Sequence, residues 1–385
     1  MRECVPLRTR ILTRRGWLSH YEVRVGDETI GYNPVTGRSE WTPVLAVHRH
    51  DDAPLVRLSN KTWTATCTPH HRWMSRHWRH TGRKGRPGIA KNQYVAEDAY
   101  VLAEQITTRH ALRLAAEADT GDGPAISGQE AELLGWVLGD GSVAHIKSKP
   151  GSDPGHLRTG TGAKVSIRLY QSKPEHVKRI DALVEGLMFN RMVRQMRTPS
   201  GELGLPLVTW EFTRTYSREL LKRSGYDHKS PVPFVLSLSP AQREAFMRGV
   251  FGAEGSLAGD GGGFGAARGT YALTRVYRQN DGPQQDAIVL SIYLSGHRPG
   301  ISEVDRRGST VGRWTVTKLA ADIRETKPFI GGEKIRRDDA GRAPVWCVTT
   351  GLGTWTARQG RQVMLTGNSR YGPPAAAESH ELAML

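Results

Sequence analysis

The sequence predicts a mostly β chain that is interrupted by an inserted α/β segment. Short runs of strand composition fill residues 4–105, and a strand–turn–strand pattern returns at 343–368. Between them lie two Gly-containing helical segments, at 128–142 and 239–256, each ending in an acidic residue followed by Gly and Ser. β material at both ends of a helical middle is typical of a domain inserted into a loop of another domain.

The composition favours a globular protein that acts on a polyanion. The chain has 385 residues, 38% of them hydrophobic, which suits two or three domains. Its formal net charge of +16 is typical of nucleic-acid-binding proteins. No long apolar run or signal peptide is present, so we expect no membrane partner. Three scattered cysteines favour a cytoplasmic location.

The first element in order is a run of short strands over residues 4–105. Segments such as TRILTRRGWLS and APLVRLSN have strand composition, and NPVTG supplies a turn. Between Ala53 and Ala96 there is no Asp or Glu, but nine Lys or Arg residues occur. The sequence leaves open whether this basic stretch is a solvated loop or a nucleic-acid contact.

Helices dominate the middle of the chain. GQEAELLGWVLGDGS at 128–142 predicts a helix that ends in Asp-Gly. A strand, AKVSIRLYQ, follows, and an amphipathic helix is predicted to begin at Pro174. A second Gly-rich helix begins at Ser239 and ends at Glu254, so the first helix is repeated. Farther on, DAIVLSIYLSG is compatible with strand or helix, and GRWTVTK with a short strand.

The last element is a strand pair that stops abruptly. Val345–Thr349 and Val363–Thr366 have strand composition and flank a Gly-rich turn. The second run ends at Gly367-Asn368-Ser369, and a Pro/Ala-rich tail follows. A turn followed by a flexible terminus would explain this pattern, and so would a peptide bond between Asn368 and Ser369 that the protein cleaves.

Motifs at the two ends of the chain resemble those of an intein. An N-terminal Cys, a Thr-x-x-His motif and an Asn before Ser occur in the family order, at Cys4, Thr68, His71, Asn368 and Ser369. The resemblance implies a split, horseshoe-like β splicing (Hint) domain that excises itself and joins Glu3 to Ser369. The implied parts are exteins at 1–3 and 369–385, splicing-domain parts at 4–125 and 341–368, and an insert at 126–340.

A second set of residues resembles the class 3 inteins. The Trp, Cys and Thr of that class fall at Trp73, Cys347 and Thr366. In that class the Cys of the C-terminal β part attacks the N-junction carbonyl directly, whereas ordinary inteins use the first Cys. Both are present here, and of Cys4 and Cys347 we favour Cys347. The resemblance implies that Thr68 and His71 assist by proton transfer and oxyanion stabilisation.

The last implied step is cyclisation of Asn368, whose side-chain nitrogen attacks its own carbonyl and releases Ser369. The family usually places His just before this Asn, and here that position is Gly367. The usual helper is missing, so we expect slow C-terminal cleavage unless another side chain substitutes. The candidates are His48, His50, His70 and Arg358.

The insert resembles a LAGLIDADG homing endonuclease. LLGWVLGDGS and FMRGVFGAEGS match the paired family motif, and their small residues let two helices pack closely. Close packing brings Asp140 and Glu254 together, and the resemblance implies that they hold Mg²⁺ against a scissile phosphate. The second copy departs from the family by Glu for Asp and by Gly252 where Asp is common. Lys164 and Lys173 are both candidates to steady charge at the phosphate.

The two resemblances together imply a self-splicing intein that carries a DNA endonuclease. The implied partners are double-stranded DNA and the flanking exteins, with Mg²⁺ for cleavage and no cofactor for splicing. A DNA-facing strand is expected to carry Arg191, Arg194 and Arg197. The internal repeat implies a monomer. The alternative is an intein, intact or degenerate, whose insert binds DNA without cutting it. A zinc site in HHRWMSRHWRH is disfavoured because no cysteine pair accompanies the histidines.

Overall fold

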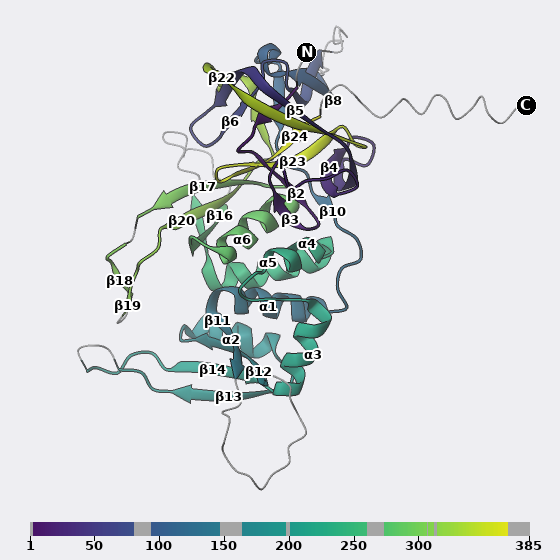
Figure 1. Ribbon diagram of the computed structural model, residues 1–385. Coiled ribbons are helices and arrows are strands. Elements are labelled where there is room, and N and C mark those ends of the chain that lie inside the picture. The colour runs from purple at the N-terminus through teal and green to yellow at the C-terminus, as the bar shows by residue number, and fades with distance from the viewer. Residues whose placement is uncertain are drawn as a thin grey trace, which may run out of the picture. The chain divides into compact units, whose positions relative to one another are not determined.

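The computed structural model describes residues 3–80, 94–146, 164–197, 201–259, 273–305, 307–311 and 314–368 (Figure 1). The chain forms two compact units. Unit 1 comprises Met1–Thr120, Ile292–Ile301 and Arg324–Leu385, and unit 2 comprises Gly121–Ser291 and Ser302–Ile323. Both ends of the chain belong to unit 1, and most of the middle folds as unit 2. The expectation of a mostly β chain is confirmed.

Unit 1 is built on a sheet with the strand order β1-β22-β5-β4-β2-β23-β24. The bounds are β1 Val5–Pro6, β2 Arg10–Thr13, β4 Glu28–Asn33, β5 Arg38–Ser59, β22 Arg336–Thr350, β23 Thr354–Gln359 and β24 Gln362–Gly367. Three further strands pair with it, β3 (Gly16–Leu18) with β2, and β6 (Thr64–Cys67) and β10 (Ala118–Asp119) with β5. Strands from the two ends of the chain therefore share one sheet, with β22 between β1 and β5 and β23 beside β2, as the purple and yellow ribbons of Figure 1 show.

Strand β22, from the C-terminal part of the chain, lies between two N-terminal strands of unit 1 and pairs antiparallel with both. On one side β22 pairs with β5, with register shifts along the way. On the other side it pairs with β1, where Val5 lies opposite Trp346. Continuing this register by one residue places Cys4 opposite Cys347. The pairing thus joins two cysteines that are 343 positions apart in the sequence.

A second sheet of unit 1 has the order β21-β9-β7-β8. The bounds are β7 Arg72–His80, β8 Tyr94–Leu102, β9 His110–Arg113 and β21 Phe329–Gly331. Two short 3₁₀ helices lie at Ala103–Gln105 and Gly332–Lys334. The described part of the basic stretch after Ala53 lies mainly in β5, β6 and β7. Its loop interpretation is therefore wrong for these residues, because each strand finds a hydrogen-bonded neighbour. Residues 81–93 lie outside the described part.

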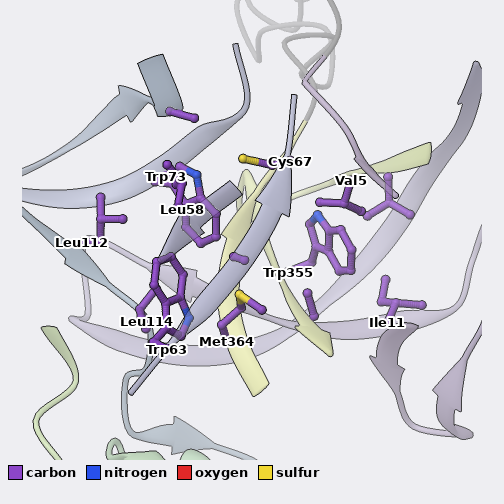
Figure 2. Close-up of a cluster of buried hydrophobic side chains, with 14 of the residues drawn as sticks. Val5, Ile11, Leu58, Trp63, Cys67, Trp73, Leu112, Leu114, Trp355 and Met364 are labelled. Atoms are coloured by element: carbon purple, nitrogen blue, oxygen red, sulfur yellow. The ribbon is translucent and has the colours of Figure 1, made fainter. Parts of the chain in front are cut away.

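An aromatic core holds unit 1 together (Figure 2). Trp63 and Trp73 pack edge to face with ring centroids 5.6 Å apart. Trp355 of β23 and Met364 of β24 belong to the same buried cluster. Cys67 is fully buried in the same cluster. Large apolar side chains from both ends of the chain thus share one core, so their burial stabilises the joined sheet.

Unit 2 repeats one arrangement, a helix followed by paired strands. The sheet orders are β11-β12-β14-β13 and β15-β16-β20-β17, and the last two strands of the second sheet run on into segments of unit 1. The strands are β11 Gly141–Ile146, β12 Lys164–Gln171, β13 Phe189–Arg194, β14 Leu207–Phe212, β15 Gly255–Gly259, β16 Leu273–Asn280, β17 Arg298–Val304, β18 Thr310–Val311, β19 Trp314–Thr315 and β20 Ala320–Thr326. The helices are α1 Gly128–Asp140, α2 Pro174–Leu183, α3 Arg214–Ser224, α4 Val232–Ser237, α5 Pro240–Glu254 and α6 Pro283–Leu294.

Helices α1 and α5 lie side by side (Figure 1) and touch through glycines. A Cβ atom on Gly135 would lie 2.1 Å from the carbonyl oxygen of Phe246, and one on Gly249 would lie 2.1 Å from that of Glu132. Because the two backbones are in direct contact there, any side chain would push the helices apart. The small residues seen in both sequence motifs therefore have a packing role.

Both of these helices begin with a capping box. Ser127 accepts a hydrogen bond from the backbone of Glu130, whose side chain bonds back to Ser127, and Ser239 and Gln242 do the same for α5. Each helix ends at its acidic residue, and the following glycine starts a strand. The repeat predicted from the sequence is thus also a repeat of local structure.

One observed strand crosses a predicted domain boundary, and two observed helices were not expected from the sequence. The boundary between residues 340 and 341 falls inside β22, because the pairing with β5 begins at Arg336. The ambiguous DAIVLSIYLSG segment forms most of helix α6, and helices α3 and α4 were not expected. In the described part of the chain, no helix has the length and apolar character needed to cross a membrane.

Candidate functional site

Cys4 and Cys347 lie in contact in unit 1. Their Sγ atoms are 2.8 Å apart, and neither residue is exposed. Neither is part of a disulfide, and both lie in a small buried cluster that includes Ala53, Leu55 and Val345. The two candidate nucleophiles of the sequence therefore occupy one place in the fold.

Thr68 binds the backbone of Cys4. Its Oγ1 accepts a hydrogen bond from the Cys4 amide at 3.0 Å and contacts the Cys4 carbonyl oxygen at 3.4 Å. Its own amide also donates to that carbonyl, at 3.0 Å. The nitrogen of the Glu3–Cys4 peptide bond is thus held by a hydroxyl group.

His71 is a buried neutral base beside the same bond. Burial lowers the pKa of His71 to about 4, hydrogen bonding to the backbone of Glu3 opposes this, and the charge of Arg72 adds to the lowering. Nε2 is 2.5 Å from Thr366 Oγ1, whereas Nδ1 has no well-aligned partner among the described residues. Trp73 packs edge-on against the ring, with centroids 5.4 Å apart. The ring is thus fixed by two members of the Trp-Cys-Thr set.

Asn368 is held at the end of β24 by backbone and side-chain bonds. Its Nδ2 donates to the Thr350 carbonyl at 3.0 Å, and Thr350 Oγ1 donates to its Oδ1 at 3.2 Å. Its amide donates to the Gly353 carbonyl at 3.0 Å. The residue is 1% exposed. Its predicted neighbour in the reaction, Ser369, lies outside the described residues.

Arg72 places a positive charge beside Asn368 and Glu3. Its Nε donates to the Asn368 carbonyl oxygen at 3.4 Å, and the same nitrogen lies 3.2 Å from Glu3 Oε2. The guanidinium stacks on Tyr100, 4.5 Å from the ring centroid. The helpers predicted from the sequence have partners of their own. His48 binds Thr349, His70 pairs with Glu104, and Arg358 binds Gly360, while His50 lies opposite Val345.

The absence of His before Asn368 has a steric reason. A Cβ atom on Gly367 would lie 2.3 Å from the carbonyl oxygen of Arg72 and 2.9 Å from its carbonyl carbon. These are backbone atoms of β7, so they cannot move aside as a flexible side chain would. The penultimate position therefore leaves no room for a histidine, and the neighbouring strand provides Arg72 instead.

The ends of α1 and α5 bring Asp140 and Glu254 together in unit 2. Burial raises the pKa of Glu254 to about 7, the Asp140 carboxylate adds to the rise, and Gln279 and Lys173 oppose it. Burial also raises the pKa of Asp140 to about 6, against the charge of Lys173 and a hydrogen bond from Gln171. The two carboxyl groups hold protons more tightly because burial disfavours their charged forms, and at Glu254 the charge of Asp140 adds to this effect.

Two glutamines complete this arrangement. Gln171 at the end of β12 donates to Asp140 at 2.9 Å, and Gln279 near the end of β16 donates to Glu254 at 3.4 Å. The sequence analysis missed both, although each lies at the equivalent place in its repeat. Lys173 acts on both carboxylates, whereas nothing is described of the Lys164 side chain.

The residues at the helix ends fit Mg²⁺. Carboxylate and amide oxygens are hard ligands of the kind that Mg²⁺ prefers. The described residues contain no group of three or more His, Cys, Asp or Glu side chains that could hold a metal ion. A carboxylate pair leaves the remaining ligand positions to water and phosphate oxygens, as is usual for Mg²⁺ at phosphodiester sites.

The three arginines predicted to contact DNA lie on or just after β13, an exposed edge strand. Arg191 is already paired with Asp181 at 3.0 Å, and Arg197 donates to the Gly201 carbonyl. Arg194 lies in an exposed position at the end of the strand. The strand thus carries positive charge at its surface, partly neutralised by Asp181.

Comparison with known proteins brings up two groups of solved structures. No protein-family model and no curated protein matches the chain. I-DmoI in complex with DNA and Mn is 15% identical over 51% of this chain and 89% of its own, with a TM-score of 0.29. The AceL NrdHF class 3 split intein is 13% identical over 30% of this chain and 67% of its own, with a TM-score of 0.23. The DnaX mini intein from Spirulina platensis is 21% identical over 31% of this chain and 72% of its own, with a TM-score of 0.21. Scores this low do not define what the chain does.

Proposed function

We propose that the chain is a self-splicing intein whose inserted domain is a LAGLIDADG-type DNA endonuclease. One observation carries the splicing proposal. Two thiols, a neutral histidine, a threonine and an asparagine from the two ends of the chain meet in a buried part of unit 1. These are the groups needed to cut two peptide bonds and to join the flanks.

The first step is attack on the Glu3 carbonyl carbon by a thiol, with Cys347 as the favoured nucleophile and Cys4 as the alternative. His71 is unprotonated at neutral pH, so it can accept the thiol proton and return it to the Cys4 nitrogen as the peptide bond breaks. Thr68 already contacts that nitrogen. The acyl group then passes from sulfur to the Ser369 hydroxyl.

The second cleavage is cyclisation of Asn368. The Nδ2 atom attacks the Asn368 carbonyl carbon, and the bond to Ser369 breaks. Thr350 holds the side-chain amide, and Arg72 donates to the carbonyl oxygen on which negative charge develops. Arg72 therefore takes the position of helper that the sequence left unfilled.

The splicing proposal is tested on the purified precursor by mass spectrometry over time. We expect joined flanks from the parent, no cleavage after position 368 in Asn368→Ala, and no release at Glu3 when Cys4→Ala and Cys347→Ala are combined. The single variants identify the first nucleophile, since only its loss abolishes thioester formation. Unchanged processing in the double variant would contradict the mechanism.

The endonuclease proposal rests on Asp140 and Glu254 at the touching ends of two repeated helices. A bound Mg²⁺ would stabilise charge at the scissile phosphate. Gln171 and Gln279 orient the two carboxylates, and Lys173 adds positive charge beside them. We expect Asp140→Asn to lose nicking of intein-free target DNA with Mg²⁺ while it retains binding. Nicking at the parent rate by this variant would remove the assignment.

A DNA-binding insert without cleavage remains the second candidate. It is favoured by Glu254, because burial raises the pKa of this carboxyl group to about 7 and so favours its protonated form. A protonated carboxyl group binds Mg²⁺ poorly. Binding without nicking at every pH between about 6 and 8 (about one unit to either side of such a pKa) would support this candidate.

A further inference from the structure

Unit 2 repeats the same local structure behind each of its two acidic residues, once in a first half (α1, β11, β12 and α2) and once in a second half (α5, β15, β16 and the first turns of α6). In each half a glutamine at or near the end of a strand, Gln171 or Gln279, donates from Nε2 to the carboxylate. Its Oε1 accepts a hydrogen bond from the next backbone amide, at 2.9 Å in the first half and 2.8 Å in the second. A helix that begins with proline follows in both. Equivalent positions in the two halves are therefore defined by structure.

The charge that follows the glutamine differs between the halves. Lys173 lies two residues after Gln171 and directly before the first proline of α2, and it is exposed. Two residues after Gln279 the second half has Asp281, and directly before the first proline of α6 it has Gly282. Whether equivalence is counted from the strand or from the helix, the second half lacks a lysine at this position.

The charge of Lys173 acts mainly on one of the two carboxyl groups. Burial is the main cause of the raised pKa of Asp140, and the charge of Lys173 is the next influence on that pKa, in the opposite direction. Burial, the Asp140 charge and the Gln279 hydrogen bond all affect the pKa of Glu254 more than Lys173 does. Among the described residues, no cation of the second half acts on either pKa. The positive charge at the helix ends is therefore one-sided.

The support behind the two glutamines is also unequal. The third residue of α2 is His176, whose Nδ1 lies 3.3 Å from Gln171 Nε2. The third residue of α6 is Gln285, which donates instead to the backbone carbonyl of Gln279, at 3.0 Å. The distance from glutamine to carboxylate is 2.9 Å in the first half and 3.4 Å in the second, which is beyond the usual range for such a bond. The first half is therefore the more firmly ordered of the two.

We propose that the endonuclease cuts one strand of its DNA site much faster than the other, because only the first half of unit 2 supplies a lysine, Lys173, to the scissile phosphate. The inference rests on the proposed endonuclease function. The two strands of a duplex are related by a twofold axis, so a protein with two similar halves presents one half to each strand.

In each cut a water oxygen forms a bond to phosphorus, and the bond to the leaving deoxyribose oxygen breaks. The water gives up a proton, and the leaving oxygen takes one up. Negative charge on the phosphate oxygens and the leaving oxygen must be stabilised during this step. The ammonium group of Lys173 provides this stabilisation for one strand, whereas Asp281 at the equivalent place in the second half opposes it for the other.

The test uses the full-length chain with Asn368→Ala and a supercoiled plasmid that carries the host gene without the codons for residues 4–368. With Mg²⁺ we expect open circles to accumulate and linear DNA to appear about a hundredfold more slowly, since loss of one preorganised stabilising group typically costs about 10²-fold in rate. Duplexes labelled at either 5′ end show which strand is cut, and the fast cut should fall on the same strand in every molecule.

Variants of single charges identify the cause of the difference. Lys173→Met should slow the fast strand about a hundredfold and leave weak, nearly equal cutting of both strands. Asp281→Lys should speed the slow strand about tenfold, less than the full effect because the new side chain is not preorganised. Asp281→Asn is the matched control, which removes the same carboxylate without adding a cation and should leave the slow strand slow. Lys318, whose Nζ lies 3.9 Å from the place of a Cβ atom on Gly282, is the alternative cation, and Lys318→Met should change neither rate.

A second readout needs no metal ion and follows binding of the same DNA in EDTA. Lys173→Met should reduce the slope of log affinity against log salt by about 0.9, because one phosphate contact is lost, and Asp281→Lys should increase it by about the same amount. Ethylation of a single phosphate on the fast strand should weaken binding by the parent and have no effect on Lys173→Met. An unchanged slope in Lys173→Met would show that this lysine does not contact phosphate.

The outcomes separate this inference from the endonuclease function. If the parent cuts both strands at similar rates, the one-sided cation is wrong and the endonuclease function stands. If Lys318→Met slows one strand and Asp281→Lys speeds neither, the second half obtains its cation from Lys318 and the inference is overturned. If neither the parent nor Asp281→Lys cuts more than Asp140→Asn, the endonuclease function fails, and this inference fails with it.

Discussion

Replacing Glu254 by Gln is expected to stabilise unit 2 at alkaline pH. The pKa of Glu254 rises from 4.5 to about 7 in the folded protein. A shift of about 2.5 units, at about 1.36 kcal/mol per unit, corresponds to about 3 kcal/mol. The folded state binds the proton more tightly than the unfolded state, so stability falls as pH rises from 4.5 to about 7. Glu254→Gln removes this cost and keeps an oxygen acceptor for Gln279.

The assay is chemical denaturation at pH 5 and pH 8, in an Asn368→Ala background that limits processing of the chain. We expect the variant to exceed the parent by about 3 kcal/mol at pH 8 and by under about 1 kcal/mol at pH 5. Glu244→Gln is the matched control, because that side chain lies on the same helix and is 77% exposed. Addition of Mg²⁺ at pH 8 should stabilise the parent and not the variant, since bound ligand adds to the free energy of unfolding.

Two results would refute this reasoning. An equal gain from Glu244→Gln would mean that the effect comes from net charge and not from the buried pair. A difference between variant and parent that is the same at pH 5 and pH 8 would mean that Glu254 does not titrate in this range, and that the raised pKa is not a property of the folded protein.

Three further predictions concern unit 1. The folded pKa of His71 lies below its unfolded value of 6.5, so stability should fall as pH drops from 6.5 toward 4, and His71→Gln should flatten that part of a stability–pH curve. Gly367→His should lower the free energy of unfolding, by about 1–3 kcal/mol as for other overpacked sites, and slow cleavage after Asn368 rather than speed it; faster cleavage in a kinetic assay would contradict the steric account. Thr366→Val should cost about 1 kcal/mol in denaturation and slow the first acyl transfer about tenfold, because His71 Nε2 loses its partner; transfer at the parent rate would show that this bond does not orient the ring.

Much of the architecture follows from local patterns in the sequence. The two helices that end at Asp140 and Glu254 are marked by capping residues, small residues and a terminal acidic-Gly pair, and all of these act within one helix or between two. The strands at both ends are short alternating runs between turn residues. Such signals depend on neighbours in the chain, so they can be recognised without the fold.

The finer features depend on contacts between distant strands. The meeting of Cys4 with Cys347 depends on the register of β1 against β22, which no local pattern specifies. Arg72 carries no motif of its own and gains its position only because β24 ends beside β7. The lack of room at Gly367 depends on the same approach, and therefore the sequence showed the missing histidine but not its cause.

The interleaved strand order of unit 1 has a consequence for protein synthesis. Strand β5 ends at Ser59, and its partner β22 begins at Arg336, which is 336 − 59 = 277 positions later. At about 5–20 residues per second, the ribosome needs roughly 14–55 s to supply that partner. Until then Cys4 lacks its neighbour Cys347 and β2 lacks β23, so the buried site of unit 1 is incomplete. The proposed cleavages would therefore have to wait until the last strands have been synthesised.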